Sequence, residues 1–260
     1  MPELPDVEGF RRVLAAHGQG RRIADVTVAD PGVLRGVSAR GLRRELVGKR
    51  FDTPERHGKW LIARTDGPVL LMHFGMTGAL VPGTPDDPPD PHDRVVFVLD
   101  DGELRFRDQR KLQGIRLGDE AEAKRVLATQ GPDAMAVGRD EFERSMSRRR
   151  GRIKAALLDQ SLIAGLGNLL ADEILWRAGV HPACPVREVE GARLRRLHTQ
   201  MRQVLRASVR VGHVPGRPSW LTGRRYEQDP HCPRCASPLC TGRVAGRGTV
   251  WCPRCQPGGC

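Results

Sequence analysis

The sequence feature that most constrains the fold lies near the C-terminus, where two Cys-x-x-Cys pairs are separated by sixteen residues. Cys232 and Cys235 form the first pair, and Cys252 and Cys255 form the second. Four thiolates at this spacing can surround one Zn²⁺ ion, so that a short segment with little apolar core folds around the metal. Disulfides are the alternative, although nothing indicates an oxidising compartment. The tail therefore predicts one structural zinc ion per chain. Cys240 is a competing candidate, but its spacing breaks the symmetry of the two pairs, so it is expected to be free.

The segment between the two cysteine pairs contains GRVAGRGTVW, which has the pattern of a β-hairpin. Such a hairpin presents Arg243 or Arg247 near its tip. These are ordinary exposed arginines on one interpretation. On the other interpretation, the metal ion fixes the turn, and the turn holds one of these arginines in position to contact a phosphate group.

Charge is distributed unevenly along the chain, which has a net charge of +12. Residues 1–120 carry 19 Lys and Arg against 19 Asp and Glu, whereas residues 121–260 carry 24 against 12. A cationic surface on the second half favours a polyanionic partner, and nucleic acid ranks ahead of membrane because no basic amphipathic stretch has a bulky apolar face. A soluble arginine-rich face is the alternative. No apolar run is long enough to span a bilayer, so no membrane association is expected.

The first half predicts one helix followed by strands. The helix is expected over about residues 5–17, and the strand pattern of alternating apolar and polar residues then recurs. The expected strands are ADVTV, KWLIA, VLLMHFGM, DRVVFVLD and ELRFRD. They predict a β-sandwich or a small barrel. Residues 82–93, PGTPDDPPDPHD, predict a flexible connection without regular structure.

From about residue 121 the pattern becomes helical. Helices are expected over 149–160 and over 169–179, where Gly179 is the expected stop. A longer helix is expected over 191–212. Its buried face is predicted to hold Leu194, Leu197, Met201, Val204, Leu205 and Ser208. The fold class is therefore α+β, and the expected domains are 1–120, 121–215 and 216–260.

The turn SLIAGLGN lies between the first two of these helices. Gly165 and Gly167 permit a tight turn, and Asn168 is expected to cap the following helix. Helix N-termini behind glycine-rich turns bind phosphate, although a plain connection between helices is commoner. Lys154 and the basic run RRRGR just before the turn favour the phosphate interpretation.

Together these pieces resemble the bacterial formamidopyrimidine-DNA glycosylase and endonuclease VIII family, which excises oxidised bases. The shared motifs are PELPDVE, HGKWL, HFGMTG, HDR, DQRK, IKAALLDQSLIAGLGNLLADEILWRAGVHP and GRGTVWCPRCQ. They span nearly the whole chain in the family's order. The resemblance implies an N-terminal β-sandwich with an opening helix, a helix-two-turns-helix domain and a four-cysteine zinc-finger hairpin.

The resemblance also implies roles for individual residues. Pro2 matches the family's nucleophile once Met1 is removed, and Glu3 matches its acid-base carboxyl group. Lys59 matches the lysine that assists β-elimination, and Arg247 matches the arginine assigned to δ-elimination. The DNA-contact positions of the family fall on His92, Arg110, Lys154 and Asn168. Taken singly, Lys59 and Arg110 favour structural roles, and only the combination of motifs favours the functional ones.

Two features depart from the purine-repair members of the family. Met76 matches a residue that fills the gap left by a flipped nucleotide, but the next filler position holds Leu112, where those members commonly carry Phe. Leucine in place of Phe loses the stacking of an aromatic ring on a base, which is worth roughly 1 to 3 kcal/mol of binding free energy. In addition, only a short segment joins the long helix to the zinc module, where purine-specific members have a longer loop over the flipped base. The lesion and the opposite-base preference therefore stay open.

The expected partner is double-stranded DNA that contains a damaged base or an abasic site. The chain is expected to act as a monomer in the bacterial cytoplasm. A relative that binds damaged DNA without excising bases is the alternative, against which the intact set Pro2, Glu3 and Lys59 argues. A zinc-knuckle RNA-binding protein is a third possibility, but aromatic residues make up only 4% of the chain, which leaves little for base stacking.

Overall fold

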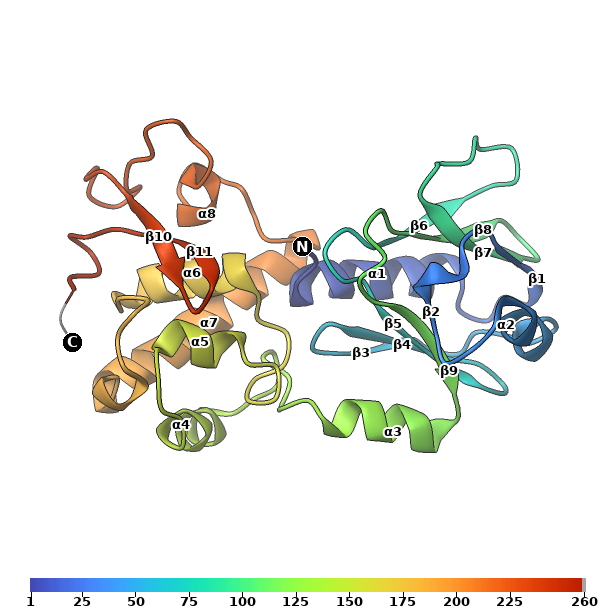
Figure 1. The fold of residues 1–260 in the computed structure, drawn as a ribbon, viewed down its shortest axis with the longest axis horizontal. Coiled ribbons are helices and arrows are strands. Elements are labelled where there is room, and N and C mark those ends of the chain that lie inside the picture. The colour runs from blue at the N-terminus through green and yellow to red at the C-terminus, as the bar shows by residue number, and fades with distance from the viewer. Residues whose placement is uncertain (259–260) are drawn as a thin grey trace. The chain divides into compact units, whose positions relative to one another are not determined.

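The computed structural model describes residues 1–258. The chain divides into two compact units, Met1–Thr129 and Gln130–Cys260. The expected further division of the second unit near residue 216 stays a prediction. Among the described residues, no helix combines the length and the apolar character that crossing a membrane requires. The elements of both units are labelled in Figure 1.

Unit 1 is built from two sheets that share one apolar core. The first sheet has the strand order β1-β7-β8-β6 and the second has the order β2-β9-β5-β4-β3. The helices are α1 (Leu4–His17), α2 (Ala39–Leu46) and α3 (Glu120–Ala128). The strands are β1 (Ile23–Val28), β2 (Leu34–Arg35), β3 (Glu55–His57), β4 (Trp60–Arg64), β5 (Val69–His73), β6 (Ala79–Gly83), β7 (Asp93–Leu99), β8 (Glu103–Arg107) and β9 (Gly114–Gly118). The expected sandwich and its opening helix are thereby confirmed.

The core of unit 1 follows from the alternation along its strands. In β7 every second residue is buried, as a half-buried antiparallel strand requires. Phe97 of β7 packs edge-on against Phe51, with 6.0 Å between ring centroids. Helix α1 adds Val7 and Leu14 to this core. The outer face of β4 and β5 is covered by α3, through contacts of Trp60 with neighbours that include Ala123.

The proline-rich segment at 82–93 is less irregular than its composition predicts. Pro82 and Gly83 end β6, where a proline is tolerated because β6 lies at the edge of its sheet. The buried Arg105 side chain then donates hydrogen bonds to the carbonyl oxygens of Thr84 at 2.7 Å and Asp87 at 3.1 Å. The expectation of no regular structure was therefore wrong at the first two residues and at Asp93, which begins β7, and the loop between them is tied to the sheet.

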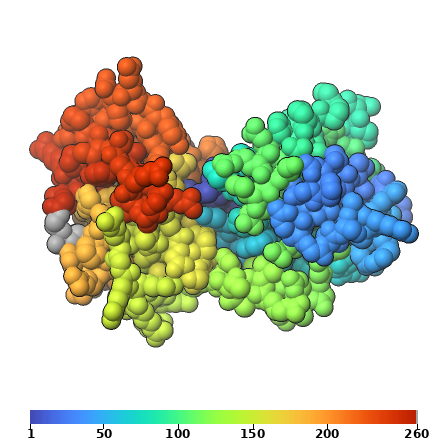
Figure 2. Space-filling view, viewed as in Figure 1, coloured from blue at the N-terminus to red at the C-terminus, as the bar shows by residue number. Residues whose placement is uncertain are grey.

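Unit 2 contains helices and one hairpin. Its helices are α4 (Arg139–Ser147), α5 (Ile153–Leu158), α6 (Asn168–Ala178), α7 (Gly191–Val211) and α8 (Leu221–Arg224). The hairpin consists of β10 (Cys240–Val244) and β11 (Arg247–Trp251). Helix α7 buries the six residues expected from its periodicity. Helix α6 ends at Gly179, whose φ of 72° is left-handed, as the predicted stop requires. In the space-filling view the red atoms of the hairpin border yellow atoms of the helical part of unit 2 (Figure 2), and β11 contacts α6.

Two local expectations differ from the structure. Helices α2, α3, α4 and α8 were not predicted individually. They are short, with four to nine residues, and none of them buries more than two residues. The residue that caps α6 is Gly167, not Asn168, and Gly167 makes no side-chain cap. Asn168 is the first residue of the helix, and its amide group bonds elsewhere, as described below.

Candidate functional site

The chain begins with an exposed Met1 followed by the half-buried Pro2 at the start of α1. Glu3 is the residue that precedes the helix, and only 1% of it is exposed. Its backbone amide donates to Asp6 Oδ2 at 2.9 Å, and this reciprocal pairing fixes the first turn. A buried carboxyl group is therefore held directly beside the predicted nucleophile, on a rigid helix start.

Lys59 lies in the tight turn that joins β3 to β4, not within a strand as expected. Gly58 precedes it with a φ of 56°, which a side chain would strain. The turn therefore presents Lys59 at the end of a hairpin whose next residue, Trp60, is buried. A hairpin turn holds a lysine more firmly than a loop does, because both flanking strands are paired.

His73, at the end of β5, is a further candidate residue of the functional site that the sequence did not predict. It pairs across the strands with Trp60, and their rings meet edge-on at 4.9 Å between centroids. Burial, and secondarily the charge of Lys59, lower the pKa of His73 to about 4. The ring is thus neutral at pH 7, and its Nδ1 accepts the Gly75 backbone amide at 3.1 Å. The proton consequently sits on Nε2, which is a donor. The sequence signal was a histidine directly before FGMTG.

Two exposed apolar side chains mark a second feature of unit 1. Met76 is 36% exposed and Leu112 is 49% exposed. Single exposed apolar side chains are common, but these two stand at the positions that the sequence predicted to fill the gap left by a flipped nucleotide. The Arg110 guanidinium lies 3.0 Å from the Met76 sulfur, and its backbone amide donates to Thr77 Oγ1 at 3.1 Å. The loops that carry Met76 and Arg110 are therefore tied together, and both apolar side chains remain accessible.

The loop that holds Leu112 is also constrained at its neighbour Lys111. Lys111 adopts a φ of 52°, in the left-handed region that favours glycine. Its ammonium group pairs with Asp30 at 2.7 Å, and Arg35 donates to its carbonyl oxygen at 2.8 Å. This turn holds Leu112 in place at the loop tip. His92 lies at a separate position, where its Nδ1 is 3.2 Å from Asp90 Oδ1.

In unit 2 the predicted residues gather around the hairpin of β10 and β11. Ala245 and Gly246 both have positive φ, at 52° and 71°, which is the two-residue turn typical of tight hairpins. Arg247 follows the turn directly, is exposed and pairs with Val244. Asn168 Nδ2 donates to the Gly248 carbonyl oxygen at 2.9 Å, which links the start of α6 to the hairpin.

Lys154 has a different environment from the other predicted DNA contacts, since none of its side chain is exposed. Its ammonium group lies 2.6 Å from Asp172 Oδ1 and donates to Thr249 Oγ1 at 2.7 Å. Asp172 also pairs with Arg225. Sequence reasoning missed Asp172 and Arg225. An acidic residue on the buried face of α6 was the available signal for Asp172, and none identified Arg225.

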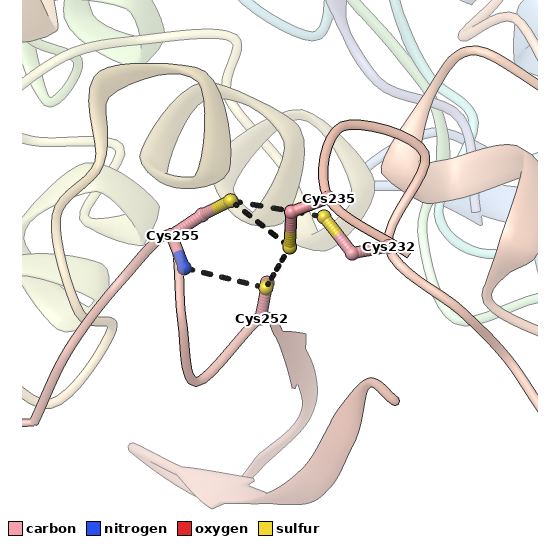
Figure 3. A group of neighbouring side chains, drawn as sticks. All are labelled: Cys232, Cys235, Cys252 and Cys255. Atoms are coloured by element: carbon pink, nitrogen blue, oxygen red, sulfur yellow. Dashed lines mark hydrogen bonds between the residues drawn. The ribbon is translucent and has the colours of Figure 1, made fainter. Parts of the chain in front are cut away.

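The four cysteines of the predicted metal site come together at the base of the hairpin (Figure 3). Their sulfur atoms lie within 4.8 Å of one another, and Cys240 is outside this group. The Cys235–Cys252 and Cys232–Cys255 sulfur separations are 3.5 Å and 3.8 Å. Disulfide sulfurs lie much closer, at about 2.05 Å. Tetrahedral coordination with Zn–S bonds of about 2.3 Å puts neighbouring sulfurs about 3.8 Å apart.

Backbone and indole N–H groups face these sulfurs as well. Trp176 Nε1 donates to Cys232 Sγ at 3.4 Å, and the Cys255 amide donates to Cys252 Sγ at 3.3 Å. Donors of this kind stabilise negative thiolates. The residues present therefore fit a four-thiolate metal site.

Comparison with known proteins extends these observations to the whole chain. Residues 1–115 match the model of the formamidopyrimidine-DNA glycosylase N-terminal domain, and residues 129–216 match the formamidopyrimidine-DNA glycosylase H2TH domain. The formamidopyrimidine-DNA glycosylase of Symbiobacterium thermophilum is 39% identical over 99% of this chain and 90% of its own length. That of Acidothermus cellulolyticus is 37% identical over 99% of this chain and 98% of its own length.

Solved structures give the same result. Lactococcus lactis Fpg in complex with DNA that contains Fapy-dG has a TM-score of 0.90 at 29% identity, covering 98% of this chain and 100% of that one. Lactococcus lactis Fpg bound to DNA with an abasic site has a TM-score of 0.88 at 29% identity, covering 98% and 99%. With both domain models matched and full-length relatives above 30% identity, the chain belongs to the formamidopyrimidine-DNA glycosylase family.

Proposed function

We propose that the protein is a bifunctional DNA glycosylase of base excision repair, which removes a damaged base from duplex DNA and then cleaves the strand at the abasic site. The family membership supports this function, as do the solved relatives bound to DNA with an abasic site or with Fapy-dG. The observation that carries this proposal is that Pro2 and Glu3 stand next to each other at the start of α1, and that Glu3 is buried. A protein that only binds DNA has no need of this pair.

The first step is a displacement at the sugar. Once Met1 has been removed, Pro2 has a secondary amine, and its nitrogen forms a bond to C1′ as the bond from C1′ to the base breaks. Glu3 transfers a proton to the ring oxygen O4′ as the sugar opens. The proline nitrogen next loses its proton, which the departing base takes up, and its lone pair forms the C=N bond of an iminium ion with C1′ as the C1′–O4′ bond breaks. The damaged base leaves during this step.

The second step is strand cleavage. The iminium ion acidifies the C2′ hydrogen, and loss of that proton expels the 3′ phosphate by β-elimination. Lys59, fixed in its hairpin turn, assists this step and pairs with phosphate. Arg247, exposed after the hairpin turn, promotes a second elimination that expels the 5′ phosphate.

The remaining predicted residues hold the DNA. Met76 and Leu112 are exposed apolar side chains suited to fill the space left by a nucleotide that has left the stack. His92, Arg110 and Asn168 are assigned to the phosphate backbone, where contacts position the duplex without reading its sequence. Lys154 was predicted for the same role, and its burial leads to a different assignment below.

The metal in this proposal is one Zn²⁺ held by Cys232, Cys235, Cys252 and Cys255, which fit it in spacing and in donor type. Zinc bound there supplies folding energy and takes no part in the chemistry, because four thiolates leave no open position. The ring-opened purine of Fapy-dG is the first lesion to test, since a solved relative binds DNA that contains it. A monomeric state and a cytoplasmic location stay predictions.

The test is borohydride trapping on a duplex with one abasic site. Protein whose mass shows that Met1 is absent is incubated with the duplex and borohydride, and the covalent adduct is mapped by peptide mass spectrometry. We expect an adduct at Pro2 and none in a matched preparation that retains Met1. The Pro2→Gly variant, whose terminal amine is primary instead of secondary, is expected to trap with reduced yield.

The opposite outcome separates the two functions considered. Tight, salt-sensitive binding of the duplex with no adduct contradicts the enzyme and leaves a protein that binds damaged DNA without excision. An adduct that maps to a lysine instead of residue 2 contradicts the assignment of Pro2. Binding alone is not support, because the basic surface binds any duplex.

A further inference from the structure

The free edge of β11 carries an unusual set of hydrogen bonds. In the register of the hairpin, Gly248 and Val250 direct their peptide groups away from β10. The Gly248 carbonyl oxygen accepts from Arg225 Nη2 at 2.6 Å, from Asn168 Nδ2 at 2.9 Å and from Lys154 Nζ at 3.3 Å. Side chains therefore occupy the place that a third strand would take.

The adjacent peptide groups are held as well. The Val250 amide donates to Asp172 Oδ2 at 3.2 Å. Thr249 Oγ1, which accepts from Lys154, donates to the Arg247 carbonyl oxygen at 2.9 Å. Residues 247–250 follow the turn directly, and Arg247 is the first of them. One cluster of side chains therefore fixes the backbone of this segment.

The cluster is buried and charged. The side chains of Lys154 and Asp172 are 0% and 1% exposed, and that of Arg225 is 10% exposed. Asp172 joins the two cations, since one carboxylate oxygen pairs with Lys154 and the other with Arg225. Charges at such burial hold one geometry, because any rearrangement leaves an ion unpaired.

We infer that Lys154, Asp172 and Arg225 form a clamp that positions Arg247 for the second elimination, so that Lys154 acts through the hairpin and not as a phosphate ligand. This inference rests on the proposed role of Arg247. Direct contact of Lys154 with phosphate requires its ammonium group to leave a carboxylate at 2.6 Å and to emerge from full burial. The clamp needs no such rearrangement.

The test compares products on duplex DNA with a preformed abasic site. Lys154→Met keeps the length of the side chain and removes its charge. We expect Lys154→Met to lower the ratio of δ to β products at least fivefold, the same effect that is expected of Arg247→Ala, with a Pro2 trapping yield within twofold of the parent. The double variant Lys154→Met/Arg247→Ala is expected to give the same ratio as Arg247→Ala alone, because both changes remove one function.

The controls separate positioning from folding and from phosphate binding. Zinc content must stay at the parent value, which shows that the hairpin still folds. Lys124→Met, at an exposed lysine of α3, is expected to leave the product ratio unchanged. The slope of log binding constant against log salt must also be unchanged, whereas a lost phosphate contact reduces it by about 1. Arg225→Gln, at the rim of the cluster, carries the test if Lys154→Met does not fold.

Several outcomes overturn the clamp. They are an unchanged product ratio in Lys154→Met while Arg247→Ala lowers it, additive losses in the double variant, or a reduced salt slope. If Arg247→Ala itself leaves the ratio unchanged, the proposed role of Arg247 fails. Hydrogen exchange then decides the clamp alone: the Val250 amide must exchange at least tenfold faster in Lys154→Met, and equal exchange rates refute it.

Discussion

Unit 1 and the hairpin of unit 2 are stabilised in different ways. In unit 1 a continuous apolar core joins both sheets and helix α1. In unit 2 the hairpin has only a small buried cluster, and two of its five buried members are Cys232 and Cys252. We therefore expect the hairpin to depend on the four clustered cysteines, which fit a metal ion, and on the charged cluster around Asp172, whereas unit 1 depends on apolar burial. We therefore expect loss of the metal to affect the functional residues of the hairpin, and loss of apolar packing to affect those of unit 1.

Removal of the metal is the strongest way to test this comparison. The Cys252→Ser variant, or chelation of the parent protein, is expected to release zinc and unfold the hairpin, because structural zinc contributes on the order of 10 kcal/mol to folding. Unit 1 is expected to stay folded. Zinc content, and limited proteolysis with peptide mapping, measure the two effects. Cys240→Ser is the matched control, because Cys240 lies outside the cluster, and it is expected to keep its zinc. Equal protease sensitivity of both units after zinc loss would contradict the comparison.

A cavity in the apolar core of unit 1 tests whether that unit depends on apolar burial alone. Phe97 is fully buried, so Phe97→Ala is expected to lower the free energy of unfolding of unit 1 by about 4 kcal/mol. Phe97→Leu is the control, with an expected cost nearer to about 1 kcal/mol. Urea unfolding measures both, and zinc content is expected to equal that of the parent. Loss of zinc in Phe97→Ala would show that the hairpin depends on the apolar core as well.

A smaller change in the free energy of unfolding of unit 1 is expected from acid, which acts through His73. Because the native pKa is about 4 and the unfolded value about 6.5, the unfolded chain binds the extra proton between these pH values. The free energy of unfolding therefore rises with pH across this window, by at most about 1.4 kcal/mol per pH unit, and is independent of this group above it. His73→Gln cannot titrate and keeps an acceptor for the Gly75 amide.

Urea unfolding of unit 1 at pH 5 and at pH 7 measures the contribution of His73. The stability of the parent protein is expected to fall more between these pH values than that of the variant. An equal fall in both proteins would mean that His73 titrates alike in the folded and unfolded states. A histidine NMR titration checks the same assignment directly, since the ring of His73 is expected to stay neutral at pH 5.

Local patterns determined much of this protein. The alternation in strands such as β7, the periodicity of α7 and the stop at Gly179 each depend on residues close together in the chain, and the structure confirms them. The two cysteine pairs indicated the metal site for the same reason, because each pair is a local turn with fixed spacing. The resemblance of the motifs to a known family predicted the chemistry that is proposed above.

Only the tertiary structure decided how distant residues combine. Lys59 was expected in a strand and lies in a turn, and Asn168 was expected to cap its helix but bonds Gly248, 80 positions away. Lys154 looked like a surface cation, yet Asp172 and Arg225 enclose it from other segments. The pKa of His73 depends on burial and on Lys59 across a hairpin. The physical reason is common to all of them: burial and long-range pairing set the environment of a side chain, and neither is encoded by its immediate neighbours in the sequence.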